Sequence, residues 1–107
     1  MIKILRFSEP LPEMILKGKK NSTFRINDEK NIKEGDELSL CYNNDEEFAK
    51  AKATEVNETT FSKLGEKEFL GHEKFSSDKE MYDLYSRYYQ MKVEPETKVK
   101  IICFKLV

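Results

Sequence analysis

The chain has 107 residues, of which 36% are charged and 38% hydrophobic, and its formal net charge is −1. This length predicts a single domain spanning residues 1–107, and seven phenylalanines with five tyrosines supply bulky material for a core. The near-zero net charge excludes binding of duplex nucleic acid through a general excess of positive charge. Duplex DNA is therefore not an expected partner, and any contact with RNA would be local.

The N-terminal part of the chain predicts a strand followed by a short helix. Residues 2–7 are predicted to form a strand with Ile2 and Ile4 as its apolar side chains and Leu5 and Phe7 as further candidates, and two prolines then interrupt it. Residues 11–15 carry apolar side chains at helical spacing. Gly18 follows and can adopt the left-handed conformation that ends a helix.

The middle of the chain predicts two strands joined by a hairpin. Residues 38–42 alternate apolar and polar side chains, as in a strand with one buried face, and Gly35 supplies the positive φ that the preceding turn needs. Residues 43–46 are turn-forming. Residues 47–58 contain alternating alanines that could also form a helix, but the turn before them and the threonines after them favour a strand.

The C-terminal part predicts short helical turns, a longer helix and a final strand. Phenylalanines, leucines and two glycines between residues 61 and 71 indicate one or two short turns. Residues 76–78 can cap a helix whose apolar residues recur at helical spacing from Met81 to Tyr88. Residues 99–107 are apolar on both faces, as in a central strand. Together these elements predict the α+β class, as a compact β-barrel with flanking helices.

Targeting, cysteine and histidine patterns narrow the function further. The N-terminus lacks the long apolar region of a signal peptide and no stretch could span a bilayer, which predicts a cytoplasmic protein without a membrane partner. Cys41 and Cys103 show no CxxC spacing and are predicted to be reduced and buried. His72 is the single histidine, so a histidine-rich zinc site is excluded. We expect no metal and no cofactor.

A candidate ligand site lies where the first helix gives way to the next strand, expected at residues 23–26. Side chains alternate faces in a strand, so Thr23 and Arg25 would share the face opposite to Phe24, which points into the core. Lys20 precedes the strand and can swing toward the same face. Such groups suit an anionic or carbonyl-bearing ligand. A solvated loop before an amphipathic strand explains the same pattern when periodicity is taken alone.

With these residues in place, the sequence resembles an ASCH domain, which is a PUA-like family. The resemblance extends over nearly the whole chain. It implies a PUA-like β-barrel whose cleft faces nucleic acid or a nucleotide-like ligand. The segments that carry it are Ile15–Lys20, Ser22–Arg25, Ile32–Leu38, Leu70–Glu73 and Ile101–Phe104.

One branch of this family, the small bacterial N4-acetylcytidine amidohydrolases, has about this length and is similar through the same stretch. In that branch a lysine accepts a proton, a threonine is the nucleophile and a downstream glutamate donates a proton. The resemblance carries these catalytic roles onto Lys20, Thr23 and Glu73. The chain differs from the branch at residues 21–22 and 26–27. The register around the glutamate leaves three other candidates for the donor: Glu66, Glu68 and Glu80.

An amidohydrolase must activate a nucleophile, stabilise an oxyanion and protonate a leaving amine. Lys20 acts as a base only when neutral, which requires burial or neighbouring cations, and we expect Lys19 and Arg25 to be such neighbours. Asn21 or Arg25 would donate to the oxyanion. Glu73 would have to keep or recover a proton near neutral pH.

The same residues support two other functions. A non-catalytic module could bind single-stranded RNA or a modified nucleoside, with Lys20 and Arg25 as anion clamps and one of the tyrosines of segment 82–89 stacking on a base. Ribonuclease action needs an acid and a base near a phosphate, and the sequence does not separate it from amide hydrolysis. No oligomeric state is implied.

Overall fold

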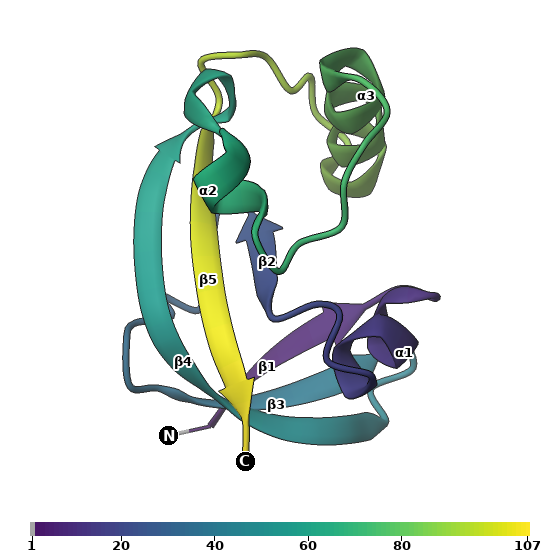
Figure 1. The fold of residues 1–107 in the computed structure, drawn as a ribbon, viewed down its shortest axis with the longest axis vertical. Coiled ribbons are helices and arrows are strands. Elements are labelled where there is room, and N and C mark those ends of the chain that lie inside the picture. The colour runs from purple at the N-terminus through teal and green to yellow at the C-terminus, as the bar shows by residue number, and fades with distance from the viewer. Residues whose placement is uncertain (1) are drawn as a thin grey trace.

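A five-stranded mixed sheet forms the body of the protein in the computed structural model, which describes residues 2–107 (Figure 1). The strand order is β1-β3-β4-β5-β2. The β1 strand is parallel to β3, and the other neighbouring pairs are antiparallel. The strands are β1 (Ile2–Phe7), β2 (Ser22–Arg25), β3 (Glu37–Tyr42), β4 (Glu47–Thr60) and β5 (Lys98–Leu106).

The long β4 strand curls the sheet. Its first half pairs with β3 and its second half with β5, and the register shifts at Leu40/Cys41 and again at Ala53/Glu55. Such irregularities bend a strand and increase its twist. The α+β class predicted from the sequence is confirmed, but the expected barrel is not closed: within residues 2–107, β1 and β2 are the two edges of the sheet.

Four helical segments accompany the sheet in the described part of the chain. Ser77 caps the longest one by accepting a hydrogen bond from the Glu80 amide at 3.1 Å. The first helix is followed by Gly18, whose φ is +77°. None of the helices within residues 2–107 has the length and apolarity needed to cross a membrane. The segments are α1 (Leu11–Leu16), the 3₁₀ turn η1 (Phe61–Lys63), α2 (Glu66–Phe69) and α3 (Asp78–Tyr89).

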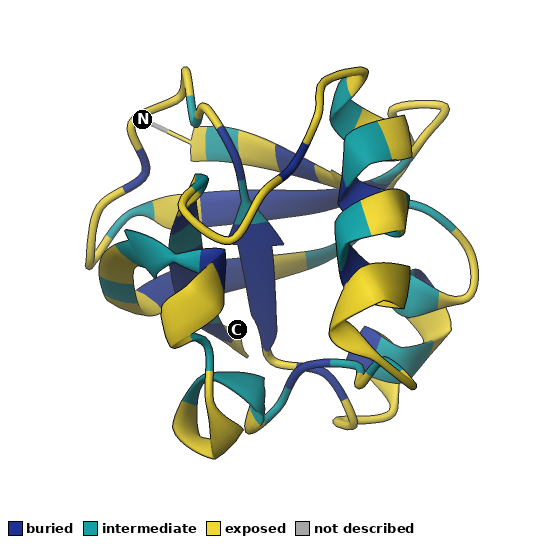
Figure 2. Ribbon diagram, turned by 90° about the horizontal axis from the view of Figure 1, so that it is seen from above, coloured by how far each residue is buried: buried dark blue, intermediate teal, exposed yellow. Residues whose placement is uncertain are grey.

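The β5 strand separates two apolar clusters, because its side chains alternate between them. Ile102 and Phe104 pack with β1, β3, β4 and α1, whereas Val99 and Ile101 pack with β2 and α3. This arrangement confirms the prediction that the last strand is central and apolar on both faces. In Figure 2 the buried residues lie mainly in the strands, although β1 and β4 also carry exposed residues, and the helices present exposed residues outward.

Several local predictions differ from the structure. In β1 the buried residues are Leu5 and Phe7, whereas Ile2 and Ile4 are exposed, because side chains alternate faces and only the face of Leu5 and Phe7 packs on the core. The β3 strand is buried on both faces over Leu38–Cys41. Both cysteines are free, but Cys103 is only half-buried.

Candidate functional site

Lys20 is the largest fully buried polar residue of the described chain, with a side chain 0% exposed to solvent. It follows the end of α1, where its amide donates to the Met14 carbonyl at 3.3 Å. Its ammonium Nζ donates to the carboxylate Oε1 of Glu73, 53 residues further along the chain. A buried ammonium is stable only with such a partner, so the burial of Lys20 depends on its ion pair with Glu73.

The loop that carries Glu73 is attached to the segment that carries Lys20. The Gly71 carbonyl accepts hydrogen bonds from the amides of Asn21 at 2.7 Å and Ser22 at 3.2 Å. Gly71 has a φ of +74°, and a Cβ at this position would lie 1.7 Å from the Asn21 Oδ1 atom. Glycine is therefore required for the close approach that brings the two halves of the ion pair together.

His72 is the second neighbour of the Glu73 carboxylate. Its ring lies 3.7 Å from the Phe24 ring with an interplanar angle of 10°, and its side chain is 1% exposed. Its Nδ1 atom is 2.8 Å from the Glu73 carbonyl oxygen and 3.1 Å from the carboxylate Oε1. Burial and the positive charge of Lys20 lower the pKa of His72 to about 4, so the ring is neutral at physiological pH.

The ionisation of the Lys20–Glu73 pair follows from burial and mutual attraction. Burial lowers the pKa of Lys20, and the nearby Glu73 carboxylate offsets only part of this effect. Burial by itself would raise the pKa of Glu73, but the charge and hydrogen bond of Lys20 outweigh it, so the pKa of Glu73 is lowered. The free protein thus holds a Lys20 ammonium and a Glu73 carboxylate. Glu73 does not keep a proton of its own near neutral pH and would have to recover one.

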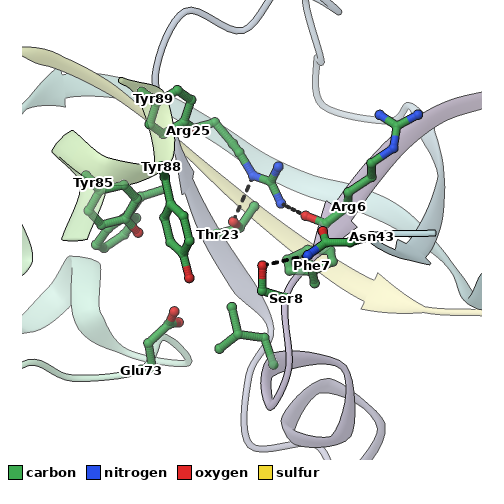
Figure 3. Close-up of a pocket in the computed structure, with 12 residues that line it drawn as sticks. Arg6, Phe7, Ser8, Thr23, Arg25, Asn43, Glu73, Tyr85, Tyr88 and Tyr89 are labelled. Atoms are coloured by element: carbon green, nitrogen blue, oxygen red, sulfur yellow. Dashed lines mark hydrogen bonds between the residues drawn. The ribbon is translucent and has the colours of Figure 1, made fainter. Parts of the chain in front are cut away.

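A cavity of about 240 Å³ opens beside this pair, with Glu73 in its wall (Figure 3). The hydroxyl groups of Thr23 and Tyr88 and the Glu73 carboxylate point into the same space. Helix α3 forms one wall through its tyrosines, and the end of β1 and the β3–β4 turn form the other. The remaining lining residues are Arg6, Phe7, Ser8, Leu11, Phe24, Arg25, Asn43, Tyr85 and Tyr89.

Arg25 holds the cavity together across the open edge of the sheet. Its Nη2 group donates to the Arg6 carbonyl of β1 at 2.9 Å, and its guanidinium lies 4.9 Å from the centre of the Phe7 ring. Its Nε group donates to the Thr23 hydroxyl oxygen at 3.1 Å. Thr23 is therefore an acceptor from a cation and keeps its own hydroxyl proton available for donation. Burial lowers the pKa of Arg25, yet arginine stays protonated in proteins.

The structure brings together four of the six side chains that the sequence singled out. Thr23, Arg25 and Glu73 line the cavity, and Lys20 contacts it through Glu73. Lys19 is exposed, and neither it nor Asn21 lines the cavity. The Asn21 side chain instead lies against Gly71.

The alternative glutamates are engaged elsewhere. Glu68 accepts from the Gly65 amide at 2.7 Å, which caps α2, and Glu80 accepts from the Ser76 hydroxyl. Glu66 lies in a separate groove between α2 and α3. Among these four glutamates, Glu73 alone contacts Lys20 in the described part of the chain.

Sequence reasoning missed other parts of the site. The contribution of β1 and the β3–β4 turn, through Arg6, Ser8 and Asn43, had no signal, because it depends on how the sheet curls. The tyrosines of the site did have a sequence signal. The i, i+3, i+4 spacing of Tyr85, Tyr88 and Tyr89 places them on one face of a helix. Among the described residues, no three His, Cys, Asp or Glu side chains converge in a way that could hold a metal ion.

Comparison with known proteins defines the fold. No protein-family model and no curated protein matches the sequence significantly. Among solved structures, the chain is similar to an ASCH domain from Lactobacillus crispatus, with a TM-score of 0.75 and 11% identity, covering 98% of this chain and 79% of that one. A protein of Enterococcus faecalis gives a TM-score of 0.83 and 16% identity, covering 100% of this chain and 80% of that one. A protein of Pyrococcus furiosus gives a TM-score of 0.71 and 25% identity, covering 100% of this chain and 98% of that one.

The chain therefore has the fold of an ASCH domain, and the PUA-like architecture predicted from its sequence is confirmed.

Proposed function

We propose that this protein is an amidohydrolase that removes the acetyl group from N4-acetylcytidine or a related modified nucleoside. The observation that carries the proposal is the ion pair of buried Lys20 with Glu73, because Glu73 lines a cavity that is also lined by Thr23 and Arg25. These are the groups that amide hydrolysis requires: a base, an acid, a nucleophile and a cation for the oxyanion.

The cavity suits a nucleobase-sized group. Its volume of about 240 Å³ lies just below the roughly 300–1,000 Å³ typical of drug-sized ligand pockets. Tyrosine side chains along one wall offer flat surfaces on which a base can stack. Glu73 is paired with Lys20 and Arg6 with Asp45, so the Arg25 guanidinium is the charged group of the lining that can interact with the carbonyl oxygen of an acetylated base.

The ion pair holds one proton that either partner can carry. Transfer of this proton along the hydrogen bond gives a neutral amine on Lys20 and a carboxylic acid on Glu73, a form without charges that burial favours. Lys20 then accepts the Thr23 hydroxyl proton while the Thr23 oxygen attacks the acetyl carbonyl carbon. Arg25 stabilises the developing oxyanion, and Glu73 donates its proton to N4 as the C–N bond breaks.

This step leaves acetyl-Thr23, the free amino base and the ion pair in its original form. Hydrolysis of the acyl group repeats the same proton transfers with water as the nucleophile. Lys20 accepts a proton from the attacking water, Glu73 protonates the departing Thr23 oxygen, and acetic acid is released, which loses its proton to the solvent as acetate. Each half-reaction begins with one proton in the pair and ends with one, so no other acid or base is needed.

The test is deacetylation of N4-acetylcytidine by the purified protein, followed by separation of cytidine from the substrate. Thr23→Val removes the hydroxyl while keeping the shape of the side chain, so we expect turnover to fall at least a thousandfold, to near background. Thr23→Ser restores a hydroxyl and should retain activity. Lys17→Ala, an exposed lysine on the other side of Gly18, is the matched control and should leave turnover unchanged. Full activity of Thr23→Val would refute the proposal.

A second candidate, a non-catalytic module for single-stranded RNA or a modified nucleoside, has one observation in its favour. Tyr88 is 53% exposed at the cavity, as a stacking platform would be. The same assay decides between the two, with a short single-stranded RNA as a second ligand. Binding of either ligand without cytidine release or RNA cleavage would favour the module, and cleavage of the RNA would favour a ribonuclease.

A further inference from the structure

We propose that His72 is a positioning residue, which holds the Glu73 carboxylate in place for proton exchange with Lys20. This inference rests on the proposed function, and its test is chosen so that the two can fail separately. His72 precedes Glu73 directly in the chain, and its ring reaches the same carboxylate oxygen that accepts from Lys20.

The hydrogen-bond partners of His72 determine its tautomer. The Glu73 carbonyl and carboxylate oxygens can only accept, so the proton of the ring must be on Nδ1. This N–H group donates a hydrogen bond to the Glu73 carbonyl oxygen, and the carboxylate Oε1 lies 3.1 Å from the same nitrogen. Electrostatic attraction between the N–H group and the carboxylate favours the orientation of the Glu73 side chain that reaches the Lys20 ammonium.

The ring itself is fixed by aromatic neighbours. It stacks on Phe24 of β2, and the Phe69 ring stands edge-on to it with centroids 6.0 Å apart. Phe24 immediately follows Thr23 in β2, so the same strand supports the nucleophile on one face and the positioning ring on the other. The geometry of the candidate nucleophile and acid is thereby set by one rigid element.

Packing alone does not account for a histidine at this position. Its Nε2 atom is buried and has no hydrogen-bond partner within residues 2–107, which costs free energy that a phenylalanine ring would avoid. A phenylalanine could stack on Phe24 equally well. What only the imidazole supplies here is the Nδ1 donor to Glu73, and it supplies this donor without a charge, because the pKa of the buried ring is lowered to about 4.

Two substitutions separate the donor from the stacking ring. His72→Phe keeps the ring and removes the donor. His72→Asn places an amide N–H near the position of Nδ1 but removes the ring. We expect His72→Phe to lower kcat for N4-acetylcytidine about tenfold at unchanged KM, with a melting temperature close to that of the parent. His72→Asn should recover most of kcat while melting at a lower temperature.

A second readout does not depend on turnover. Carbon-13 NMR of the labelled Glu73 carboxyl group reports its pKa, which should shift upward in His72→Phe because the carboxylate loses a donor, and return toward the parent value in His72→Asn. Ile32→Val is the matched control: it removes one methyl group from the apolar cluster on the other side of β5 and lowers the melting temperature, but should leave the pKa of Glu73 and kcat unchanged.

The inference is overturned if His72→Phe has the kcat and the Glu73 pKa of the parent, or if His72→Asn is as impaired in both as His72→Phe. If the parent protein releases no cytidine, the proposed function fails, and the Glu73 titration alone then decides whether His72 positions the carboxylate.

Discussion

Removing Glu73 should destabilise the protein more than removing Lys20, although the two residues form one ion pair. The Lys20 side chain is 0% exposed, whereas that of Glu73 is 21% exposed. Glu73→Gln therefore leaves an ammonium with no access to water. Lys20→Met leaves a carboxylate that reaches solvent and still lies 3.1 Å from the His72 Nδ1 atom.

These exposures set the expected magnitudes. Breaking a buried ion pair by removing one partner costs about 3–5 kcal/mol of unfolding free energy. We expect Glu73→Gln to cost about 3 kcal/mol, because Lys20 can relieve part of the cost by losing its proton. Lys20→Met should cost about 1–2 kcal/mol. The double variant should cost no more than about 2 kcal/mol, because replacing both charged groups leaves no unpaired ion. The sum of the two single costs then exceeds the cost of the double variant by a coupling energy of about 2 kcal/mol or more.

Urea unfolding at pH 7 of the parent, both single variants and the double variant measures this coupling. The matched control is Lys17→Met, which breaks the ion pair with Glu13, whose side chains are 59% and 63% exposed, and should cost less than about 0.5 kcal/mol. The reasoning is refuted if the two single costs add within about 0.5 kcal/mol, or if Lys20→Met is the more damaging change.

The pH dependence of the Glu73→Gln variant gives an independent check. The pKa of Lys20 is lowered by burial in the folded protein and takes its ordinary value of about 10.4 in the unfolded chain. Between these two values the unfolded chain binds a proton that the folded protein does not. The stability of the variant should therefore increase with pH up to about 10.4, and more steeply than that of the parent.

Three further predictions concern the loop, the rim and the buried ring. Gly71→Ala should lower the free energy of unfolding by about 1 kcal/mol more than Gly35→Ala does, and it should also slow turnover. Both variants replace a glycine of positive φ, but only the Cβ at position 71 would displace Asn21 and so shift the loop that carries Glu73. Tyr88→Ala should raise KM for N4-acetylcytidine about tenfold through lost stacking, with an unfolding free energy within about 0.5 kcal/mol of the parent, because the side chain is 53% exposed. The pKa of His72 is lowered from 6.5 to about 4, so the unfolded chain binds an extra proton between these values, and this residue should make stability rise by about 3 kcal/mol from pH 4 to pH 6.5.

Each of these predictions has its own contradicting result. Equal losses of stability in the two glycine variants, measured by urea unfolding, would show that the contact with Asn21 is unimportant. An unchanged KM in Tyr88→Ala would remove the stacking role. The contribution of His72 is measured by subtracting the pH profile of His72→Phe from that of the parent, and a flat difference between pH 4 and pH 6.5 would contradict the buried neutral ring.

Predictions from the sequence succeeded where a few neighbouring residues determine the outcome. The cap at Ser77, the positive φ of Gly18 and Gly35, and the shared face of Thr23 and Arg25 are local consequences of residue type and strand alternation. They failed where the packing of a strand face on the core decides burial. The sequence alternation of β1 does not show which of its faces packs on the core, and Ile4 lies on the face that remains exposed.

The lysines of the last strand illustrate the same limit. Lys98, Lys100 and Lys105 lie in the last strand, where the sequence pattern by itself suggests a face exposed to water. Lys98 and Lys105 are exposed. Lys100 instead donates to the Asp28 carboxylate at 2.8 Å, with both side chains largely shielded from water. Asp28 lies 72 residues earlier in the chain, and nothing in the local pattern connects the two.

The sequence by itself determined the α+β class, the order of the helices and strands, and the group of residues around Thr23 in which to look for a site. Those properties follow from periodicity and turn chemistry, which act over a few residues. Only the tertiary structure decided that the Lys20 ammonium is buried against Glu73, that His72 reaches the same carboxylate, and that Arg25 spans the open edge of the sheet. These contacts join residues far apart in the chain, and they form because Gly71 lets one loop approach the start of β2 closely enough to exclude water from the charges between them.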